Sequence, residues 1–394
     1  MTGRWTAVAA YALMAAATQV LWLTFAPITT DAAAHYGVST GAIGWLANVF
    51  PLLYVVLAIP AGIALDRSFR AALAVGAVLT AAGGLLRLAG DQYSMVLAGQ
   101  LLVAIAQPFV LNAITRVAGS YLTEADRPKG IAVGSAGTFG GMVAAFLMGA
   151  VMDIHTLLIT QAVIAVVSAV ALMVALRVPG QYHRGSESTG LAAFRETWRD
   201  PFVRRLCALV FVPFGAFISL TTWTEALLKP AGVSSDQAGI ILIANVIAGV
   251  IGSALIPVWA TKRRRELWTI LVAVAVTAAS CLALAAAPGF ALAVLVFTLF
   301  GFLLLPALPI VLELSERRAS ASEGATAGLI WLAGNLGGLL VAGVVGALVD
   351  HPAAAFILMA AVVLTAIPML RGLRADVAAL PQLTTGDTMG EVRS

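Results

Sequence analysis

Glu225 is the acidic residue of this chain that lies clearly inside a long apolar stretch, about one helical turn before the end of that stretch. The other 18 of the 19 aspartates and glutamates fall in polar connections, in the tails or at the ends of apolar stretches. An ionisable group inside hydrocarbon is costly, and where it occurs it commonly binds a proton or another cation. Glu225 is therefore a candidate proton site or cation anchor. The alternative is a structural ion pair with Lys229, four residues later on the same helix face.

Amide side chains form a second group of polar residues within apolar stretches. An amide in hydrocarbon needs either a hydrogen-bond partner on another helix or a water-filled cavity. Gln161 stands apart from the others and is better explained by a bond between helices. For the rest, both a polar path and interhelical bonds remain open. They are Gln19, Asn48, Gln100, Gln107, Asn112, Asn245 and Asn335.

Tryptophan and proline residues share these stretches. Trp22, Trp223 and Trp331 are candidate ligand contacts, because a tryptophan face contributes roughly 1–2 kcal/mol to binding a quaternary ammonium in a dry site. Packing or anchoring at a membrane interface is the alternative for each. Pro108 and Pro306 occupy like places in the two halves of the chain. Each removes a backbone hydrogen bond, so each permits bending of a gating helix or simply a fixed kink.

Metal, cofactor and catalytic signatures are absent from the sequence. The four histidines lack metal-ligand spacing, and Cys207 and Cys281 lie in apolar segments, where we expect them to pack as small side chains. We find no catalytic triad or phosphate loop. The sequence therefore predicts a protein without cofactor or resident metal and without enzymatic activity.

Composition and hydropathy explain what must position these residues. The 394 residues are 61% hydrophobic and only 11% charged, with a mean hydropathy of +0.98. Soluble domains carry about 25% charged residues. Twelve apolar runs of about 20 residues match the roughly 30 Å of a bilayer core, and the period-two alternation of a barrel is missing. We expect an all-α polytopic membrane protein whose principal surroundings are the lipid bilayer.

The longest polar connection divides the twelve runs into six and six. We predict an N-terminal bundle over residues 1–176, a cytoplasmic linker over 177–202 and a C-terminal bundle over 203–374. Residues 375–394 are polar and are expected to form a disordered cytoplasmic tail.

Lysine and arginine residues predict the orientation. With the N-terminus inside, only Arg87 and Lys229 of the 23 cations fall outside. The positive-inside rule therefore places both termini in the cytoplasm, and we expect the plasma (inner) membrane. The run Lys262–Arg265 is explained by topology and lipid contact, so nucleic-acid binding is not expected. We expect a monomer.

A glycine-rich sequence motif occurs in the fifth apolar run of each half. Ala136–Gly141 and Ala333–Gly338 read alike at an offset of 197 residues, and an acid, Asp153 or Asp350, follows each at the same distance. This is an internal repeat. We expect its glycine faces to let the fifth and eleventh runs approach their neighbours closely.

The loop between the second and third runs carries a recognisable motif. This loop resembles the signature loop of the major facilitator superfamily. Its residues are Gly62-Ile63-Ala64-Leu65-Asp66-Arg67-Ser68-Phe69-Arg70, with Phe69 where that pattern has a second glycine. The resemblance implies the major facilitator fold, with twelve transmembrane helices in two six-helix pseudo-symmetric bundles. Asp66, Arg67 and Arg70 would hold one conformation through carboxylate and helix-end contacts. A charged turn that serves topology alone is the alternative.

Four further groups of short motifs resemble one solute-carrier family. They are Tyr36-Gly37-Val38-Ser39 with Ile43 and Trp45-Leu46; Gly99-Gln100 with Ala106-Gln107-Pro108-Phe109 and Leu111-Asn112; Gly215-Ala216-Phe217; and Glu313-Leu314-Ser315 with Ser322-Glu323-Gly324 and Gly328-Leu329. They are similar to the feline leukaemia virus subgroup C receptor-related carriers, associated with choline, ethanolamine and haem. The resemblance implies that Trp22 and Asn335 contact substrate. The tyrosine that the family has after Gly-Ala-Phe is Ile218 here, and its glutamine of the fifth span falls on Phe139, which leaves the substrate open.

Two functions remain in view, with a non-transporting membrane receptor as a remote third. The first is alternating-access uniport of a small choline-like cation or amine down its gradient. The second is proton-coupled export of drugs or amphiphilic metabolites with Glu225 as the proton site. The candidate substrate-binding residues are Gln19, Trp22, Gln107, Asn112, Phe139, Phe217, Ile218, Glu225, Trp331 and Asn335.

Overall fold

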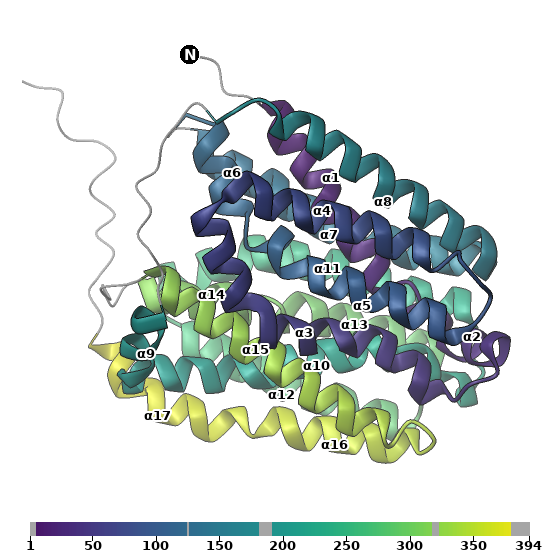
Figure 1. The fold of residues 1–394 in the computed structure, drawn as a ribbon. Helices are drawn as coiled ribbons and strands as arrows, with labels where there is room; N and C mark the ends of the chain where they lie inside the picture. The colour runs from purple at the N-terminus through teal and green to yellow at the C-terminus, as the bar shows by residue number, and fades with distance from the viewer. Residues whose placement is uncertain (1–4, 124–125, 181–190, 317–322, 380–394) are drawn as a thin grey trace, which may run out of the picture.

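The protein is described by a computed structural model that covers residues 5–123, 126–180, 191–316 and 323–379. Within these ranges lie twelve helical spans long and apolar enough to cross a membrane, arranged as two bundles of six (Figure 1). We call the side on which α1 begins and α17 ends the terminal side, and the opposite side, which carries α2, the far side (Figure 1).

Within the described ranges, nine helices and one 3₁₀ turn belong to the first half and its connection to the second. They are α1 (Trp5–Trp22), η1 (Ala26–Ile28), α2 (Thr29–Tyr36), α3 (Thr40–Arg67), α4 (Phe69–Leu86), α5 (Tyr93–Leu111), α6 (Ile114–Tyr121), α7 (Arg127–Val151), α8 (Ile154–Leu176) and α9 (Leu191–Arg199). The helix α9 lies in the polar connection.

The described part of the second half holds eight helices and one 3₁₀ turn. They are α10 (Pro201–Leu228), η3 (Lys229–Ala231), α11 (Ser235–Arg263), α12 (Glu266–Ala286), α13 (Phe290–Leu304), α14 (Ala307–Glu316), α15 (Glu323–Gly346), α16 (Pro352–Leu364) and α17 (Ala366–Ala378). The helix α17 continues four residues past the expected boundary at residue 374, and the expected tail from residue 380 lies outside the described residues.

Several spans consist of two helices joined at a break. The fourth span is interrupted just after Pro108, between α5 and α6, and the tenth is interrupted at Pro306, between α13 and α14. Pro306 lies within the break, as expected of a residue that lacks a backbone donor and crowds the preceding turn. Pro108 lies inside α5, and the break follows only at Asn112 and Ala113. The first span is interrupted between Trp22 and Ala26, so that η1 and α2 cross the far side at a new angle.

The glycine repeat sets the packing inside the first half. A Cβ atom added at Gly137 would lie 2.4 Å from the carbonyl oxygen of Ala12, and one at Gly141 would lie 2.3 Å from that of Ala16. Both distances are shorter than any van der Waals contact, so α7 and α1 approach closely only because these positions lack side chains. Gly140 meets no atom within 4 Å and has no such role.

The second half repeats this arrangement with α15 against α10. A Cβ atom at Gly337 would lie 2.0 Å from the carbonyl oxygen of Phe211. Gly334 and Gly338 instead make room for the side chains of Phe214 and Ile218. The expected close approach of the fifth and eleventh spans to their neighbours is thus confirmed, although different glycines of the repeat provide it in the two halves.

The acids that follow the glycine repeats differ in role. Asp153 is the N-cap of α8, where its Oδ1 accepts a hydrogen bond 3.1 Å from the backbone nitrogen of Thr156. Hydrogen bonds from Thr156 hold the pKa of Asp153 below its usual value. In the second half the N-cap of α16 is His351 rather than Asp350, and no side-chain cap is formed there.

The two halves pack on each other through α7 with α11 and through α3 with α15. On the far side a Cβ atom at Gly239 of α11 would lie 2.8 Å from Cβ of Ala150 of α7. The largest hydrophobic cluster crosses this interface and includes Trp22, Phe50 and Phe217. Terminal-side residues of the first half, such as Tyr11, form a separate cluster that contains no described residue of the second half. Apolar packing therefore joins the halves mainly toward the far side.

Candidate transport site

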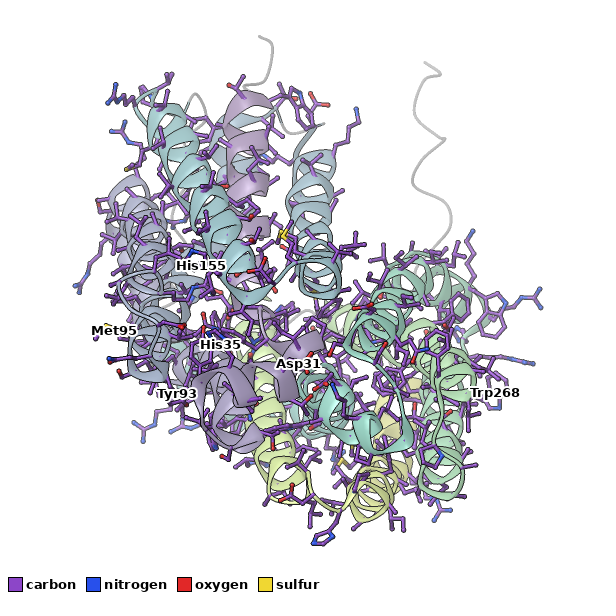
Figure 2. All side chains as sticks on the ribbon, turned by 90° about the vertical axis from the view of Figure 1, so that its right-hand side faces the viewer. Asp31, His35, Tyr93, Met95, His155 and Trp268 are labelled. Carbon is purple, nitrogen blue, oxygen red and sulfur yellow. The ribbon has the colours of Figure 1, made fainter. Side chains whose placement is uncertain are left out.

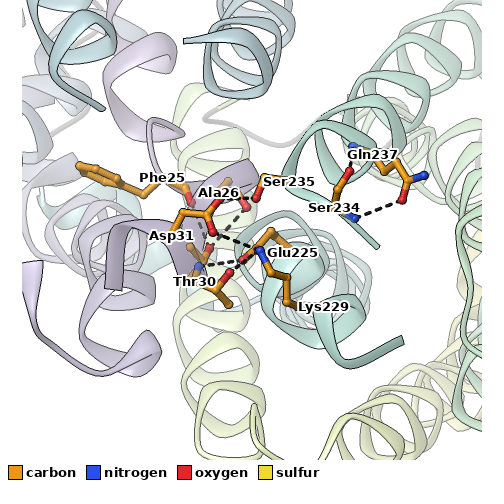
Figure 3. A network of polar contacts seen from close by, with 10 residues as sticks. Phe25, Ala26, Thr30, Asp31, Glu225, Lys229, Ser234, Ser235 and Gln237 are labelled. Carbon is orange, nitrogen blue, oxygen red and sulfur yellow. Dashed lines mark hydrogen bonds and ion pairs between the residues drawn. The ribbon is translucent and has the colours of Figure 1, made fainter. Parts of the chain in front are cut away.

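The carboxylate of Glu225 joins the two halves on the far side. It is completely buried near the end of α10, and it accepts hydrogen bonds from the backbone nitrogen of Thr30 at 2.8 Å and from its hydroxyl at 2.5 Å (Figure 3). Lys229 Nζ lies 3.5 Å from the same carboxylate. The structural ion pair weighed for Glu225 is present, and Thr30, 195 residues away in the chain, supplies the two hydrogen bonds that the sequence does not reveal.

The neighbouring Asp31 makes a second connection between the halves. Its carboxylate lies 3.1 Å from Lys229 Nζ and accepts a 2.5 Å hydrogen bond from the Ser235 hydroxyl at the start of α11 (Figure 3). Figure 2, which looks onto the far side, shows Asp31 near the middle of the molecule, where the halves meet. We call Thr30, Asp31, Glu225, Lys229 and Ser235 the far-side clasp. Asp31 and Lys229 are partly exposed, so their pair contributes at most about 1 kcal/mol, and the buried Glu225 contacts dominate.

Trp223 fills the space behind the clasp. Its ring is 1% exposed and lies against Gly44 of α3 and Gly346 of α15, and its Nε1 donates to the carbonyl oxygen of Ala342 at 2.8 Å. A Cβ atom at Gly44 would lie 1.8 Å from the ring. Trp223 therefore seals the contact between the halves, and the role of ligand contact considered from the sequence does not fit its position.

An aromatic surface lies deeper in the second half. Trp331 is 38% exposed and stands edge-on to Phe214, with 5.8 Å between the ring centroids. Phe214 in turn contacts Phe217 at 6.3 Å. One turn beyond Trp331, the Asn335 amide donates to the Trp331 carbonyl oxygen at 3.0 Å. Ile218 is buried against Gly338 and presents no polar group.

The candidates of the first half are more enclosed. Trp22 is 9% exposed, its Nε1 donates to the carbonyl oxygen of Ala47 at 3.0 Å, and its ring lies 6.1 Å from that of Phe50. Gln19 and Gln107 are buried, and Phe139 is half-buried against the main cluster. Trp22 and Phe217 thus share one cluster, whereas the side-chain hydrogen bonds of Trp22 and of Asn335 stay within their own halves.

Asn112, at the break between α5 and α6, forms hydrogen bonds to α3. Its Oδ1 accepts from the Tyr54 hydroxyl at 2.6 Å, and its Nδ2 donates to the carbonyl oxygen of Ala58 at 3.3 Å. Both partners lie on α3. For Asn112 the interhelical alternative therefore describes this conformation.

The loop between α3 and α4 anchors to α8. Arg70 Nη1 donates to the carbonyl oxygen of Leu176 at 3.4 Å, and Arg67 is exposed. The side chain of Asp66 lies outside the described residues. Nearby, Arg116 of α6 donates to the carbonyl oxygen of Leu65 at the end of α3.

The second half has a counterpart of that contact with the opposite charge. Glu313 of α14, which follows Arg116 by the repeat offset of 197 residues, accepts from the Thr261 hydroxyl at the end of α11. The terminal-side ends of α3 and α11 are therefore held by charged residues at equivalent positions, through a backbone carbonyl in the first half and a side-chain hydroxyl in the second.

Arg87 is a buried residue whose position the sequence did not predict. Counted on the outer side at the end of the third apolar run, it is only 1% exposed. It donates to Thr24 Oγ1 at 2.9 Å, to Gln161 Oε1 at 3.1 Å and to Gln100 Oε1 at 3.3 Å. Gln161 also accepts from Thr24 at 2.7 Å, which confirms its expected interhelical bond. Arg87 thus fixes the segment between α1 and η1, next to Trp22 and the far-side clasp.

Asn48 and Asn245 are two of the amides that the sequence places within apolar stretches, and the structure shows that they form an equivalent pair. Both are completely buried, and among the described residues neither amide group has a hydrogen-bond partner. They stand at equivalent places on α3 and α11, again 197 residues apart. The repeat offset itself was the available signal, because it extends beyond the glycines to this pair of amides.

Comparisons with known proteins agree with this architecture. The chain is 26% identical over 359 residues to solute carrier family 49 member A3 of Danio rerio, covering 84% of this chain and 76% of the relative. It is 24% identical over 355 residues to the choline/ethanolamine transporter FLVCR1 of Felis catus, covering 81% of this chain and 63% of that protein's length. The fold matches the crystal structure of a point mutant of the nucleoside transporter NupG with a TM-score of 0.73 at 15% identity, over 93% of this chain and 100% of that one.

The family profile extends over both bundles. It matches residues 7–342, which include the far-side clasp, the aromatic surface and both glycine repeats. The expected fold is confirmed, and the chain is an integral membrane transporter rather than an enzyme. The chain belongs to the Major Facilitator Superfamily.

Proposed function

We propose that the protein is a facilitative uniporter that moves a small organic cation or amine, such as choline, by alternating access. The observation that carries this proposal is the composition of the aromatic surface. Trp331, Phe214, Phe217 and Asn335 offer ring faces and an amide, and their ring and hydrogen-bond partners among the described residues include no carboxylate. Such a surface suits a quaternary ammonium, which binds ring faces without needing a counter-ion. The related protein from Felis catus is named a choline/ethanolamine transporter, which supports the same substrate class.

The contacts between the halves support a specific conformation for this proposal. The far-side clasp and Trp223 close the far side, so the substrate exchanges on the terminal side in this state. By the positive-inside rule, the terminal side faces the cytoplasm. The protein lies in the plasma membrane and acts as a monomer. The first half completes the substrate path with five residues, which are Trp22, Gln19, Gln107, Asn112 and Phe139. Gating involves five further residues, which are Asp66, Arg67, Arg70, Pro108 and Pro306.

Uptake of labelled choline into proteoliposomes tests the proposal. With no pH gradient and no membrane potential, uptake should saturate, and it should be accelerated by unlabelled choline loaded inside, as a uniporter exchanges faster when both sides are occupied. Absence of uptake, together with absence of any thermal shift by choline or ethanolamine, contradicts the choline assignment.

Proton-coupled export is the second candidate, and the position of Glu225 is the observation that favours it. A buried carboxylate that closes the far side through accepted hydrogen bonds releases that side when it becomes protonated. This function predicts transport driven by an imposed pH gradient and lost in Glu225→Gln. Unchanged uptake under opposite pH gradients excludes it.

A further inference from the structure

Two adjoining cavities lie at the terminal-side ends of α12 and α17, away from the interface between the halves. Both are open to the surface, and their volumes are about 620 Å³ for the larger and about 380 Å³ for the smaller. Both are lined by Leu267, Trp268 and Arg374, so they share a wall. Figure 2 shows Trp268 at the outer edge of the second half, far from Asp31 at the centre. The cavities therefore belong to a part of the surface that the proposed transport path does not use.

The larger cavity is strongly basic. Arg264, Arg265 and Arg374 line it, and all three are exposed. Its acidic lining residue, Glu266, is 3% exposed and already has an interaction partner, so its carboxylate offers little to a ligand. The excess of positive charge favours an anionic ligand.

The smaller cavity continues from this basic region onto an apolar wall. Leu271, Ile367 and Leu370 line it beside Leu267, and Arg371 joins Arg374 at its rim. It lies between the ninth and twelfth spans, whose outward faces carry exposed apolar residues such as Leu282 and Ile357. The two cavities together thus present arginines next to hydrocarbon at one end of two membrane-spanning helices.

Trp268 marks the boundary between the two environments. Its side chain is 52% exposed, and the Arg265 guanidinium lies 5.7 Å from the ring centroid. Tryptophan favours the level of the lipid headgroups, where its ring touches hydrocarbon and its N–H remains in a polar layer. The cavities therefore sit at the depth of phospholipid phosphates.

Arg264 is held over the larger cavity by an unusual backbone. Its φ is 53°, and among the described residues it alone adopts a positive φ without being glycine. It ends α11, and its N–H donates to the carbonyl oxygens of Ala260 and Thr261. Glycine is the residue that adopts this conformation most cheaply at a helix end. An exchange to glycine therefore removes the cation without disturbing the fold.

We propose that these cavities form a binding site for an anionic phospholipid, with its phosphate between Arg264, Arg371 and Arg374 and one acyl chain along Leu271 and Ile367. Guanidinium groups bind phosphate oxygens through paired, charge-assisted hydrogen bonds. A free phosphate ion would use the basic cavity but gain nothing from the apolar one. The adjacent apolar cavity is the reason for choosing a lipid as the ligand.

Titration of the 394-residue chain in dodecyl maltoside with phosphatidylglycerol, read by native mass spectrometry and by the unfolding temperature, tests the site. Wild type should form a saturable 1:1 adduct and gain thermal stability, and phosphatidylcholine should do neither. Arg371→Gln with Arg374→Gln should weaken binding about 30-fold, as expected for two arginines at an anionic lipid. Arg264→Gly should also weaken binding while its unfolding temperature without lipid stays equal to or above that of wild type.

The matched control is Lys262→Gln with Arg263→Gln, which removes the same charge from the neighbouring turn but from outside both cavities. This control should keep wild-type affinity within a factor of about three. Equal losses in both double variants would show attraction by general charge and overturn the site. So would equal binding of phosphatidylcholine, or replacement of the lipid by glycerol phosphate at the same concentration. A variant truncated after Ala379 provides a further check. If it binds lipid and the 394-residue chain does not, then residues 380–394 occupy the cavities, and the proposal is wrong.

Discussion

Thr30 and Glu225 are joined by two hydrogen bonds to one buried carboxylate, one from the backbone of Thr30 and one from its hydroxyl. Thr30 belongs to the first half and Glu225 to the second, so the pair exists only while the far side is closed. Since the carboxylate is completely buried in this state, opening the far side exchanges these bonds for water. In the proposed alternating-access cycle, the pair would couple the chemistry of one side chain to the conformation of the transporter.

Glu225→Gln should favour the state with the far side open. Hydrogen bonds to a charged group contribute about 1.5–3 kcal/mol, so a loss of about 2 kcal/mol shifts the equilibrium roughly 30-fold. Spin labels at Ala34 and Asp236, on opposite halves of the far side, would report the longer distance. Lys229→Gln, which alters a partly exposed partner, should shift the populations several-fold less. Identical distance distributions in wild type and Glu225→Gln would contradict this role.

Gly44→Ala should prevent normal closure of the far side. The added Cβ would lie 1.8 Å from the Trp223 ring, which is itself wedged against Gly346 and has no free space. We expect the transport rate to fall by about 5- to 150-fold, because overpacking typically costs about 1–3 kcal/mol. Adding Trp223→Leu should restore part of the rate by making room for the methyl group. If the double variant is no faster than Gly44→Ala, the contact is not the cause.

Gly337→Ala should destabilise the second half, whereas Gly343→Ala should not. The first substitution places a methyl group 2.0 Å from the carbonyl oxygen of Phe211, and the second meets no atom within 4 Å. Because both exchanges raise helix propensity alike, their difference isolates the close approach of α15 to α10. We expect unfolding temperatures that differ by several degrees in detergent. Equal unfolding temperatures for the two variants would show that α15 can move away from α10 without loss of stability.

Trp331→Ala should weaken choline binding by about 3- to 30-fold, since a cation over a tryptophan ring gains roughly 0.5–2 kcal/mol. Trp331→Phe should recover part of the affinity because it keeps a ring at the same place. Trp259→Ala serves as the control, as it removes a tryptophan of similar exposure from the terminal-side end of α11. Binding of labelled choline to purified protein measures the effect, and equal losses for Trp331 and Trp259 would reject the assignment.

Arg87→Met should destabilise the first half while keeping an apolar stem of similar length. Thr24, Gln100 and Gln161 would each lose a charged donor, but Thr24 and Gln161 keep the hydrogen bond between them. Gln100 Oε1 would be left without a partner among the described residues, and such a buried polar group costs about 1–3 kcal/mol. We expect a lower unfolding temperature and reduced transport, because the segment that leads from Trp22 to Thr30 loses its anchor. Arg67→Met, at an exposed position, is the comparison and should leave the unfolding temperature unchanged.

The twelve spans and the repeat were predictable from the sequence because they depend on local chemistry. Hydrocarbon accepts only segments whose backbone bonds are satisfied internally, so each apolar run of sufficient length becomes a helix. The offset of 197 residues paired the glycines of α7 and α15 before any contact was known, and the structure shows that both helices use them for close approach. The interhelical bond of Gln161 and the ion pair of Glu225 with Lys229 followed from the same local reasoning.

Tertiary structure alone decided what those helices meet. Nothing near Glu225 in the sequence points to Thr30. Nothing near Arg87 points to its partners either, which come from the segment between α1 and η1, from α5 and from α8. Trp22 and Trp223 look equivalent as aromatic side chains in apolar runs, yet Trp223 is wedged between the two halves and Trp22 bonds within one. Hydropathy and spacing report how one segment behaves toward its solvent. The partners of a buried polar or aromatic group depend on how segments far apart in the chain cross, and that information exists only once the bundles have assembled.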